Sequence, residues 1–558
     1  MRHFSLLYLL AAFMLFSSCE DVFDTDSTSA VIDKGEMIDN PADTLYSVMG
    51  ILSQLQKLGE RYVLMGELRG DLLTTTSNAA SDLQEVAAFN VSEGNVYSDR
   101  MDYYAVINNC NFALQRMDTT ILNYQTKVML PEYVAILAMR DWTYWQMALT
   151  FGYVRFVDEP LLNLESTLKA YPTMDIVGMA QTIITDLTPY VAVRHLDYGS
   201  VDGINTSSLF VPIELFLADV HLFLNNYEQA ASLYYDYINR NRLTVSRSYL
   251  NEWTVSTRTD ATMNWLGSYT GETLFQMAYS SDAKDYHPTL IRLSYNTKPS
   301  IVPTNYFVEG MTQRMYFYTQ PGNTNVSAYL QGDMRGQAIN RSGVSLPASY
   351  GVFQTTGYNG LLINKYLQAA TSTNTGYDPQ NEAFTSLRFT RQIPLIRTSH
   401  VYLRFAEAVN RLGKPSMAFA VLKHGLTINT MEDSLKVNPG ELLGERFTDF
   451  SWSHTNGENE NVGTTSRGLG RGITTDTEHY VIGEQESLED SMLVVENMIV
   501  EEMAAETAFE GNRFFDLLRV ARHRDAFPQY LAEMVSRRYE NPQSAFEHLN
   551  RQDAWWVK

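Results

Sequence analysis

The residue types that commonly carry catalysis form no recognisable motif in this chain of 558 residues. The sequence has no His-Glu-x-x-His motif, no Gly-x-Ser-x-Gly nucleophile turn and no phosphate-binding loop ending in Gly-Lys-Ser/Thr. The glycine-rich stretch from Gly468 to Gly472 lacks the spacing of a dinucleotide-binding loop. A carboxylate pair for glycoside hydrolysis stays open, because 64 acidic residues allow many geometries. We therefore expect a protein that is not an enzyme.

Metal-binding patterns are equally weak. The ten histidines are scattered, and the two cysteines, Cys19 and Cys110, are too few for a cysteine-rich zinc site. Oxygen-rich stretches such as Asn323-Thr-Asn325 have ligands that suit a structural calcium ion, but no complete EF-hand loop is present. The sequence thus predicts no cofactor, with structural calcium left open.

Composition and charge exclude several classes of protein. About 45% of the residues are hydrophobic, which is enough for a large core and excludes disorder throughout. The formal net charge is −22, the wrong sign for neutralising phosphates, so nucleic acid is not expected as a partner. A polybasic membrane-surface binder is excluded for the same reason.

The first forty residues predict the compartment. Arg2 precedes an apolar run from Phe4 to Phe16, which has the length of a signal-peptide core and is too short to span a bilayer comfortably. The run ends at Ser17-Ser18-Cys19, which resembles the lipobox of bacterial lipoproteins. We expect residues 1–18 to be a signal peptide, Cys19 to be acylated, for example with palmitate, and residues 19–40 to be an acidic tether.

Paired helical patterns organise the rest of the chain. Apolar residues recur at three- and four-residue steps, and turn signals separate the members of a pair, as Gly413 and Pro415 do. The sequence ADVHLFLNNYEQAASLYYDYI reads as a tetratricopeptide-type hairpin. Helical hairpins are expected near residues 100–152, 211–240, 400–428 and 487–524.

Two polar stretches interrupt these helices. Residues 241–400 are rich in Thr, Ser, Asn, Gly and Tyr and include a strand-like piece at 273–279, and residues 440–486 are also polar and glycine-rich. Long irregular stretches within a domain are often functional. We expect one mostly α-helical domain over residues 41–558, with loop-rich ligand-binding insertions at 241–400 and 440–486.

The longest helical segment that the sequence predicts runs from Ser487 to Arg524. Acidic residues crowd its beginning and arginines its end, a polarity that complements the helix dipole. The spacings Glu510/Arg513 and Asp516/Arg519 predict pairs of charges on the helix surface.

Several segments resemble one family. The string EEMAAETAFEGNRFFDLLRVAR, residues 501–522, resembles the C-terminal signature of the SusD/RagB lipoproteins. Further family segments match at Cys19 with the acidic residues that follow it, at residues 131–160, and at the strings GETLFQMAY and YLRFAEAVNRLG. These segments occur in the order that the family has. The residues after Tyr539 depart from the family pattern, because they lack its proline-rich closing segment.

The resemblance implies a fold, a function and partners. SusD-like proteins have a mostly α-helical fold in which four tetratricopeptide-like hairpins support long loops and a few short strands. They are non-enzymatic outer-membrane lipoproteins on the cell surface, and they capture nutrient for a SusC-like TonB-dependent transporter. The ligand is most often an oligosaccharide, whereas RagB-like members handle peptides.

Glycan capture requires aromatic platforms for the apolar faces of sugars, together with polar side chains for the hydroxyl groups. The ligand-binding residues that we expect are Arg69, Asp71, Asn78, Tyr97, Trp265, Tyr269, Tyr286 and Tyr358. Further candidates are Thr74, Trp253, Tyr306 and Trp452. Any one aromatic residue is more often part of the core than of a ligand platform.

Three alternatives remain open at this point. A RagB-like protein would bind peptide instead of glycan, and a high tyrosine content suits either cargo. A surface glycoside hydrolase would need two of the many carboxylates. A helical-repeat scaffold would bind protein partners only.

Overall fold

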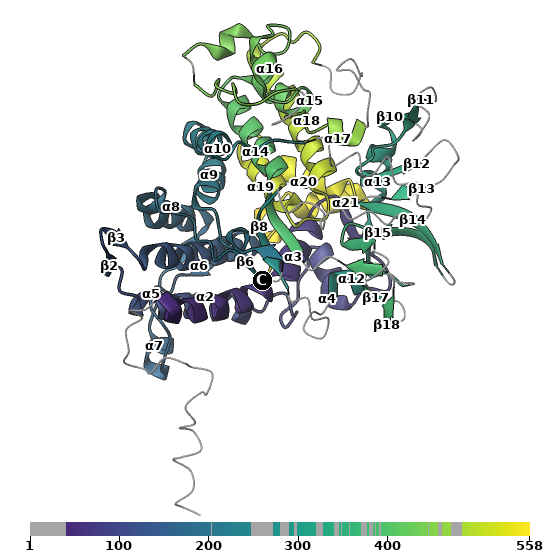
Figure 1. Ribbon diagram of the computed structural model, residues 1–558. Coiled ribbons are helices and arrows are strands. Elements are labelled where there is room, and N and C mark those ends of the chain that lie inside the picture. The colour runs from purple at the N-terminus through teal and green to yellow at the C-terminus, as the bar shows by residue number, and fades with distance from the viewer. Residues whose placement is uncertain are drawn as a thin grey trace, which may run out of the picture.

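The computed structural model describes residues 41–558, with gaps at 202, 247–271, 280–288, 295–297, 320–326, 340–344, 348, 356–357, 370–375, 379–382, 386, 390–391, 445, 456–459 and 470–481. Helices dominate the described residues, and the strands form small two-stranded sheets (Figure 1). The expected fold class, mostly α-helical with a few short strands, is therefore confirmed. The signal peptide, Cys19 and the acidic tether lie outside the described residues.

The helices follow the chain in two groups. The first group comprises α2 (Pro41–Gln56), α3 (Gly59–Glu67), α4 (Ser81–Ala87), α5 (Met101–Arg116), α6 (Leu130–Phe151), α7 (Leu164–Leu168), α8 (Ile176–Leu187), α9 (Ile213–Phe223) and α10 (Tyr227–Asn241). The second comprises α12 (Thr289–Ser294), α13 (Asn305–Thr312), α14 (Thr398–Arg411), α15 (Pro415–Lys423), α16 (Ile428–Glu432), α17 (Ser466–Leu469), α18 (Leu488–Thr507), α19 (Arg513–Arg522), α20 (Gln529–Ser536) and α21 (Pro542–Leu549). Short 3₁₀ turns are η1 (Thr188–Tyr190), η2 (Thr206–Leu209), η3 (Pro439–Leu442) and η4 (Gln552–Ala554).

The strands pair antiparallel in twos. The pairs are β1 (Leu73–Thr75) with β9 (Ile301–Pro303), β2 (Leu122–Asn123) with β3 (Thr126–Lys127), β4 (Tyr153–Arg155) with β5 (Thr173–Asp175), β6 (Ser200–Val201) with β7 (Ile204–Asn205), β8 (Thr273–Ala278) with β20 (Gln392–Arg397), β10 (Met315–Thr319) with β11 (Ser327–Gln331), β12 (Gln337–Ile339) with β13 (Ser345–Pro347), β14 (Tyr350–Thr355) with β15 (Tyr358–Ile363), β16 (Leu367–Ala369) with β19 (Leu387–Phe389), and β17 (Gly376–Asp378) with β18 (Ala383–Thr385). The hairpins from β10 to β18 lie together on one side of the helices (Figure 1). The strand-like piece expected at 273–279 is β8.

The structure has helices in each of the four regions for which the sequence predicts a helical hairpin. Within these regions α5 packs on α6, α9 on α10 and α14 on α15. Gly152 ends α6 and Gly413 follows α14, both with a positive φ that a glycine adopts without a steric penalty. The helix α8, which the periodicity analysis did not predict, also packs on α6.

The helical hairpin that the sequence predicts at 487–524 consists of α18 and α19, and the chain turns sharply between them. Phe509 and Gly511 both have positive φ, and Gly511 lies against α3. A Cβ atom on Gly66 of α3 would lie 1.7 Å from the Gly511 carbonyl oxygen. The two backbones therefore meet at a distance that only glycine permits.

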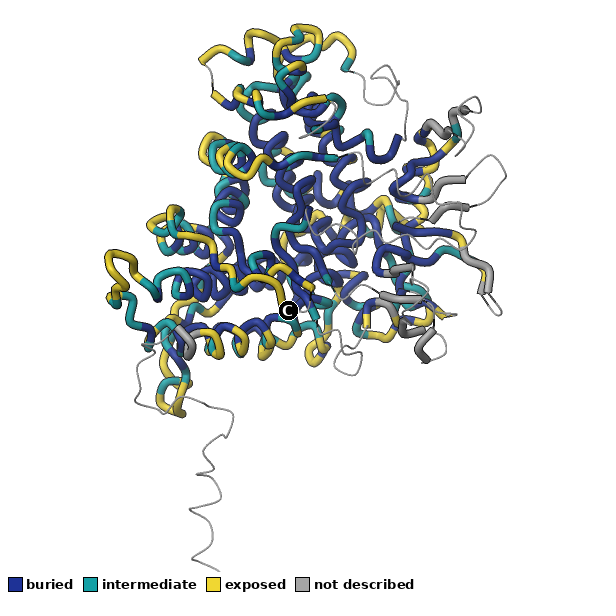
Figure 2. Tube along the Cα trace, viewed as in Figure 1, coloured by how far each residue is buried: buried dark blue, intermediate teal, exposed yellow. Residues whose placement is uncertain are grey.

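The core runs through the centre of the molecule. Figure 2 shows buried segments gathered where α14, α18 and α19 cross, with exposed segments on outer turns. Among the described residues, one stretch, Thr206–Phe223, is long and apolar enough to cross a membrane by composition, but 67% of it is buried inside the fold. That burial is typical of a core helix.

Candidate functional site

Two loops that carry the predicted ligand-binding residues Asn78 and Tyr97 lie beside the helix α4 (Ser81–Ala87). The first follows β1, which pairs with β9, and Thr76 continues the pairing by donating its backbone N–H to the Ser300 carbonyl at 2.9 Å. The Thr76 hydroxyl accepts the Asn78 N–H at 3.1 Å. This turn leaves Asn78 exposed.

The second loop carries Tyr97. The Asn95 side chain fixes it by donating to the Asp82 carbonyl at 3.1 Å and to Glu85 at 2.9 Å, and by accepting the Tyr97 N–H at 2.9 Å. Hydrogen bonds from Asn95 and Ser92 lower the pKa of Glu85, so the carboxylate stays ionised and holds the loop. Because Asp82 and Glu85 belong to α4, the helix anchors the Tyr97 loop.

The Tyr97 ring is half-buried beside Arg61. The Arg61 guanidinium carbon lies 5.9 Å from the ring centroid, and the guanidinium donates to the Val96 carbonyl at 2.6 Å. Burial raises the pKa of Tyr97 to about 12, so its hydroxyl remains a hydrogen-bond donor at neutral pH. Val96 is 59% exposed next to it. The loop therefore offers an apolar surface and a phenol, and the first loop offers an amide, which are groups that bind hydroxylated ligands.

Two predicted ligand contacts lie in the interior and require correction. Arg69 is only 1% exposed, and its guanidinium donates to the carbonyls of Met65 at 2.9 Å and Trp555 at 3.1 Å. Asp71 is fully buried in a bidentate pair with Arg513, at 2.5 and 2.8 Å. A ligand cannot reach either side chain, so both have structural roles. The hydrogen bond from Arg69 to the Trp555 carbonyl also holds the atypical C-terminal end against the rest of the fold.

The other predicted residues have varied positions. Thr74 is half-buried in β1, and the Trp452 indole donates to Asn239 at 2.7 Å. Tyr306 belongs to α13, is 38% exposed and accepts a hydrogen bond from Arg537. Tyr358 begins β15 opposite Thr355 of β14. Trp253, Trp265, Tyr269 and Tyr286 lie outside the described residues.

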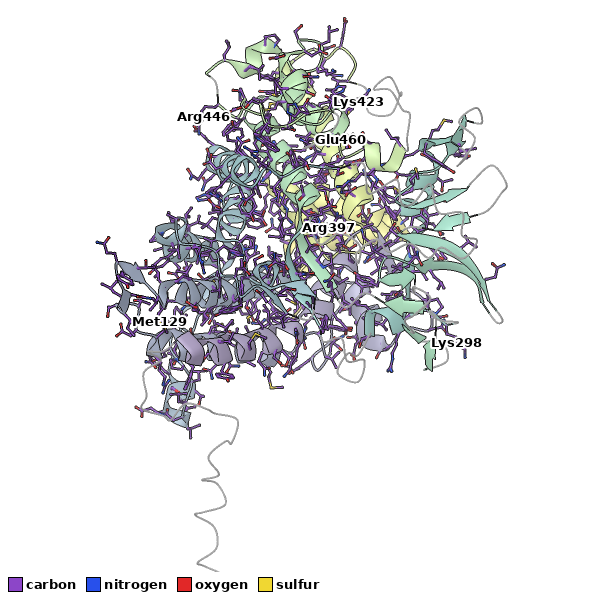
Figure 3. The ribbon with its side chains drawn as sticks, in the orientation of Figure 1. Met129, Lys298, Arg397, Lys423, Arg446 and Glu460 are labelled. Carbon is purple, nitrogen blue, oxygen red and sulfur yellow. The ribbon has the colours of Figure 1, made fainter. Side chains whose placement is uncertain are left out.

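The sequence analysis missed a cluster of buried charges, which we call the interior ion network. Arg335 contacts Glu502 at 2.6 Å, Arg397 contacts Glu510 at 2.8 Å and Arg467 contacts Glu506 at 2.7 Å. Figure 3 shows Arg397 inside the molecule. The network comprises Glu272, Arg314, Asp333, Arg335, Lys365, Arg397, Arg467, Glu502, Glu506 and Glu510.

The network also corrects the prediction of surface pairs on the last helices. Glu510 pairs with Arg397 and Lys365 instead of Arg513, and all of them are buried. The Asp516–Arg519 pair forms at 2.7 Å, but it too lies in the interior. Local spacing predicted the Asp516–Arg519 pair, but the partners of Glu510 come from distant parts of the chain.

The electrostatics of the network indicate a structural function. Burial alone would raise the pKa of Glu506, but Arg467, Arg397 and Arg335 outweigh it and lower the pKa to about 2. Burial lowers the pKa of Lys365 to about 8, and Glu510 opposes that shift. Glu506 is sealed from solvent and held ionised by arginines, so it is unsuited to act as a general acid near neutral pH.

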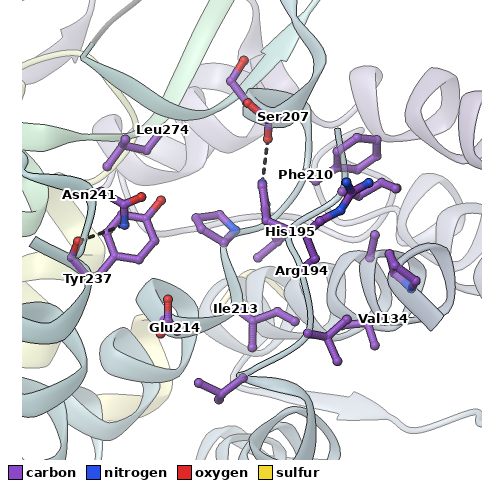
Figure 4. Close-up of a pocket in the computed structure, with 18 of the residues that line it drawn as sticks. Val134, Arg194, His195, Ser207, Phe210, Ile213, Glu214, Tyr237, Asn241 and Leu274 are labelled. Carbon is purple, nitrogen blue, oxygen red and sulfur yellow. Dashed lines mark hydrogen bonds between the residues drawn. The ribbon is translucent and has the colours of Figure 1, made fainter. Parts of the chain in front are cut away.

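Three sizeable cavities open on the described surface. One of about 750 Å³ is lined by Phe89, Tyr539, Asn541 and His548, and one of about 780 Å³ lies between α13, α18 and α20. A third, of about 640 Å³, lies between α6, α9, α10 and the start of β8 (Figure 4). All three volumes are in the range of small-ligand pockets.

No cluster that suits a metal ion is found in the described part of the chain, where no three His, Cys, Asp or Glu side chains gather in a suitable way. The stretch Asn323-Thr-Asn325 lies outside the described residues.

Comparisons with known proteins identify the fold. No protein-family profile and no curated protein matches the sequence. A solved SusD superfamily protein from Bacteroides vulgatus superposes with a TM-score of 0.56 at 14% identity, covering 93% of this chain and 95% of that one. Another from Bacteroides thetaiotaomicron gives 0.54 at 17% identity, covering 86% and 89%. A structure described as a laminarin-binding SusD-like protein gives 0.52 at 14% identity, covering 91% and 95%. This protein has the SusD-like fold.

Proposed function

We propose that this protein, with its SusD-like fold, is a non-enzymatic surface lipoprotein that captures oligosaccharide and delivers it to a SusC-like TonB-dependent outer-membrane transporter. The observation that carries the proposal is the fold. Solved SusD-like structures superpose on about nine tenths of this chain. One of them is described as laminarin-binding, and another as a SusD-like carbohydrate-binding protein from Bacteroides vulgatus, the latter at 14% identity, a TM-score of 0.50 and coverage of 86% and 83%.

The two loops beside α4 supply the proposed ligand face. Asn78 offers an amide to sugar hydroxyls, whereas Val96 and the Tyr97 edge offer an apolar surface with a phenol. Such a shallow face binds through stacking and a few hydrogen bonds, which corresponds to affinities of roughly micromolar to millimolar. Affinity in that range allows the ligand to be passed on.

Anchoring and partnership complete the proposal. Acylation at Cys19 tethers the protein to the outer membrane through the acidic segment 19–40, at the cell surface. The transporter then lies within reach of a tethered lid. Neither step requires a cofactor.

A catalytic role has less support than capture. The carboxylates of the interior ion network are buried and paired with arginines. A glycoside hydrolase needs two accessible carboxyl groups of different pKa on either side of the scissile bond. The network lacks that access.

The test is isothermal titration calorimetry with protein that starts at Glu20, against panels of neutral oligosaccharides and peptides, followed by product analysis of the same samples. We expect saturable binding of an oligosaccharide without cleavage. Asn78→Ala should weaken it several-fold, because one hydrogen bond to the ligand is worth about 0.5–1.5 kcal/mol. The matched control, Asn550→Ala, changes an exposed asparagine at the end of α21 and should leave binding unchanged.

Other outcomes would redirect the proposal. Saturable binding of peptides alone would indicate a RagB-like cargo, and product formation would contradict the non-enzymatic part. No binding in either panel would favour a scaffold that recognises protein partners only.

A further inference from the structure

The cavity between α6, α9 and α10 differs from the loop face in its elements and in its charge. Its walls come from α6, the segment after η1, η2, α9, the end of α10 and the start of β8. None of these elements belongs to the loops around Asn78 and Tyr97. Figure 4 shows the side chains of Arg194, Glu214 and Tyr237 around the same space.

The charge of the lining is positive in a strongly acidic protein. The basic and acidic side chains that line the cavity are Arg194, His195, Glu214 and Arg240. With the histidine neutral, the lining carries one net positive charge, whereas the whole chain carries −22. A local positive site in a negative surrounding favours an anionic ligand over a neutral one.

Glu214 and Arg240 neutralise each other. Their two side chains form a bidentate pair, with Arg240 Nη1 2.7 Å from Glu214 Oε1. The pair holds α9 and α10 together at the rim of the cavity. Arg240 is therefore committed to a partner within the protein, so Arg194 carries the available charge.

Arg194 is exposed and forms no ion pair with any residue that the structure describes. The carboxyl group that acts on it is Glu132, which is mostly buried. Burial raises the pKa of Glu132, and Arg194 only partly opposes this shift. A guanidinium with free donors at a cavity wall is well suited to bind a carboxylate through two parallel hydrogen bonds.

The remaining lining suits a sugar ring. The Tyr237 ring is half-buried, with the Arg240 guanidinium 5.6 Å from its centroid. Burial and Glu214 raise the pKa of Tyr237 to about 12, so the phenol keeps its proton. Asn241 places an amide nearby by donating to the Tyr237 carbonyl at 2.9 Å, and Val134 and Ile213 add apolar surface.

His195 contributes an acceptor. Its Nε2 lies 2.8 Å from the Ser207 carbonyl oxygen, which can only accept, so Nε2 carries the hydrogen. Burial lowers the pKa of His195, and the neutral ring then has a lone pair on Nδ1. The cavity thus combines a cation, an aromatic face, an amide and an acceptor.

We propose that this cavity is a second ligand site that binds a carboxylated sugar unit of an oligosaccharide, with Arg194 on the carboxylate and Tyr237 and Asn241 on the ring. The volume of about 640 Å³ is sufficient for a small ligand. This inference rests on the proposed capture of oligosaccharide and adds that acidic sugars bind at a place separate from the loop face.

The test uses a trimer of galacturonic acid and the neutral galactose trimer with the same linkage, titrated into protein that starts at Glu20. The acidic trimer should bind more tightly, and its affinity should fall as the salt concentration rises. Arg194→Gln should weaken it at least tenfold, which corresponds to one charge-assisted contact of about 1.5–3 kcal/mol. Binding of the neutral trimer should stay within twofold of wild type.

Two further variants provide controls. Arg155→Gln removes another exposed arginine of the same charge, located on β4 away from the cavity, and should leave binding of the acidic trimer unchanged. Ala192→Trp keeps every charge but fills the cavity from its exposed wall, so it should abolish binding of the acidic trimer. Thermal unfolding of each variant checks that the fold is intact.

The outcomes separate this inference from the proposed function. Equal affinity for the acidic and neutral trimers, equal effects of Arg194→Gln and Arg155→Gln, or loss of acidic binding in Asn78→Ala instead of Arg194→Gln would each overturn the second site while leaving oligosaccharide capture intact. Absence of binding to every oligosaccharide would overturn both. Arg194-dependent binding of a free-acid peptide, but not of its amidated form or of the acidic trimer, would overturn the assignment to sugar.

Discussion

Charged side chains have different surroundings in the interior ion network and in the cavity between α6 and α10. In the network, each arginine faces two or more carboxylates, and all of them are sealed from solvent. At the cavity, Glu214 and Arg240 form one pair, and Arg194 keeps free donors at the surface. Interior charges are committed to the fold, whereas the cavity retains a charge that is available to a ligand.

Desolvation is the physical reason for the difference. A buried ion loses its water and is tolerated only when partners replace that water completely. An exposed ion keeps its hydration and needs no partner. Removing one member of the network should therefore have a much larger effect on stability than removing a member of a surface pair.

The largest expected effect is that of Arg397→Met. The substitution leaves Glu506 and Glu510 with fewer compensating charges in the interior, and we expect it to lower the free energy of unfolding by about 3–5 kcal/mol. Urea denaturation followed by circular dichroism measures the change. A loss below 1 kcal/mol would contradict the structural role of the network.

The next effect depends on pH and concerns Glu67. Burial raises the pKa of Glu67 from 4.5 to about 7, although the Gly511 N–H donates to its carboxylate at 2.8 Å. The protonated form is therefore favoured in the fold, so this stabilisation is complete below pH 4.5 and is lost as the pH rises through 7.

Glu67→Gln keeps an acceptor for Gly511 but removes the ionisation. We expect the stability of the variant relative to wild type to increase between pH 5 and pH 8, by up to about 3 kcal/mol. Asp141, whose pKa burial also raises to about 7, remains in both proteins and cancels in the difference. A pH-independent difference in melting temperature would show that Glu67 does not titrate in this range.

A third effect tests how closely the backbone of α3 at Gly66 packs against Gly511. Gly66→Ala would place a methyl group against the Gly511 carbonyl, and we expect a loss of about 1–3 kcal/mol. Gly50→Ala is the matched control, because Gly50 lies in α2 and a methyl group added there would have no neighbouring atom within 4 Å. It should stabilise the protein by about 0.5–1 kcal/mol. Equal effects of the two substitutions would mean that the α3 contact with Gly511 is loose.

The smallest effect is expected for the surface pair Arg446–Glu228, whose side chains are 52% and 67% exposed. Figure 3 shows Arg446 at the outside of the molecule and Arg397 within it. Arg446→Met should cost less than about 1 kcal/mol, and the cost should shrink in high salt. If it matched the cost of Arg397→Met, burial would not be what separates the two classes of ion pair.

The errors in the sequence analysis have a common cause. Arg69 and Asp71 are predicted ligand contacts, yet the Asp71 partner, Arg513, is 442 residues further along the chain. Likewise Glu510, spaced for a local pair with Arg513, instead contacts Arg397, 113 residues earlier. Local spacing cannot distinguish a solvated charge from one whose partner arrives from elsewhere in the fold.

Periodicity within the sequence was sufficient to predict the helices of the hairpins, because the burial of one helix face repeats every three or four residues and is a local property. Gly413 and Pro415 likewise mark the boundary between α14 and α15 through their own backbone preferences. Only the tertiary structure decided which charges are buried and which line a cavity, since Arg194, Glu214 and Tyr237 meet there from three separate segments. Burial and partnership depend on what surrounds a side chain in space, and the neighbouring residues in the sequence do not contain that information.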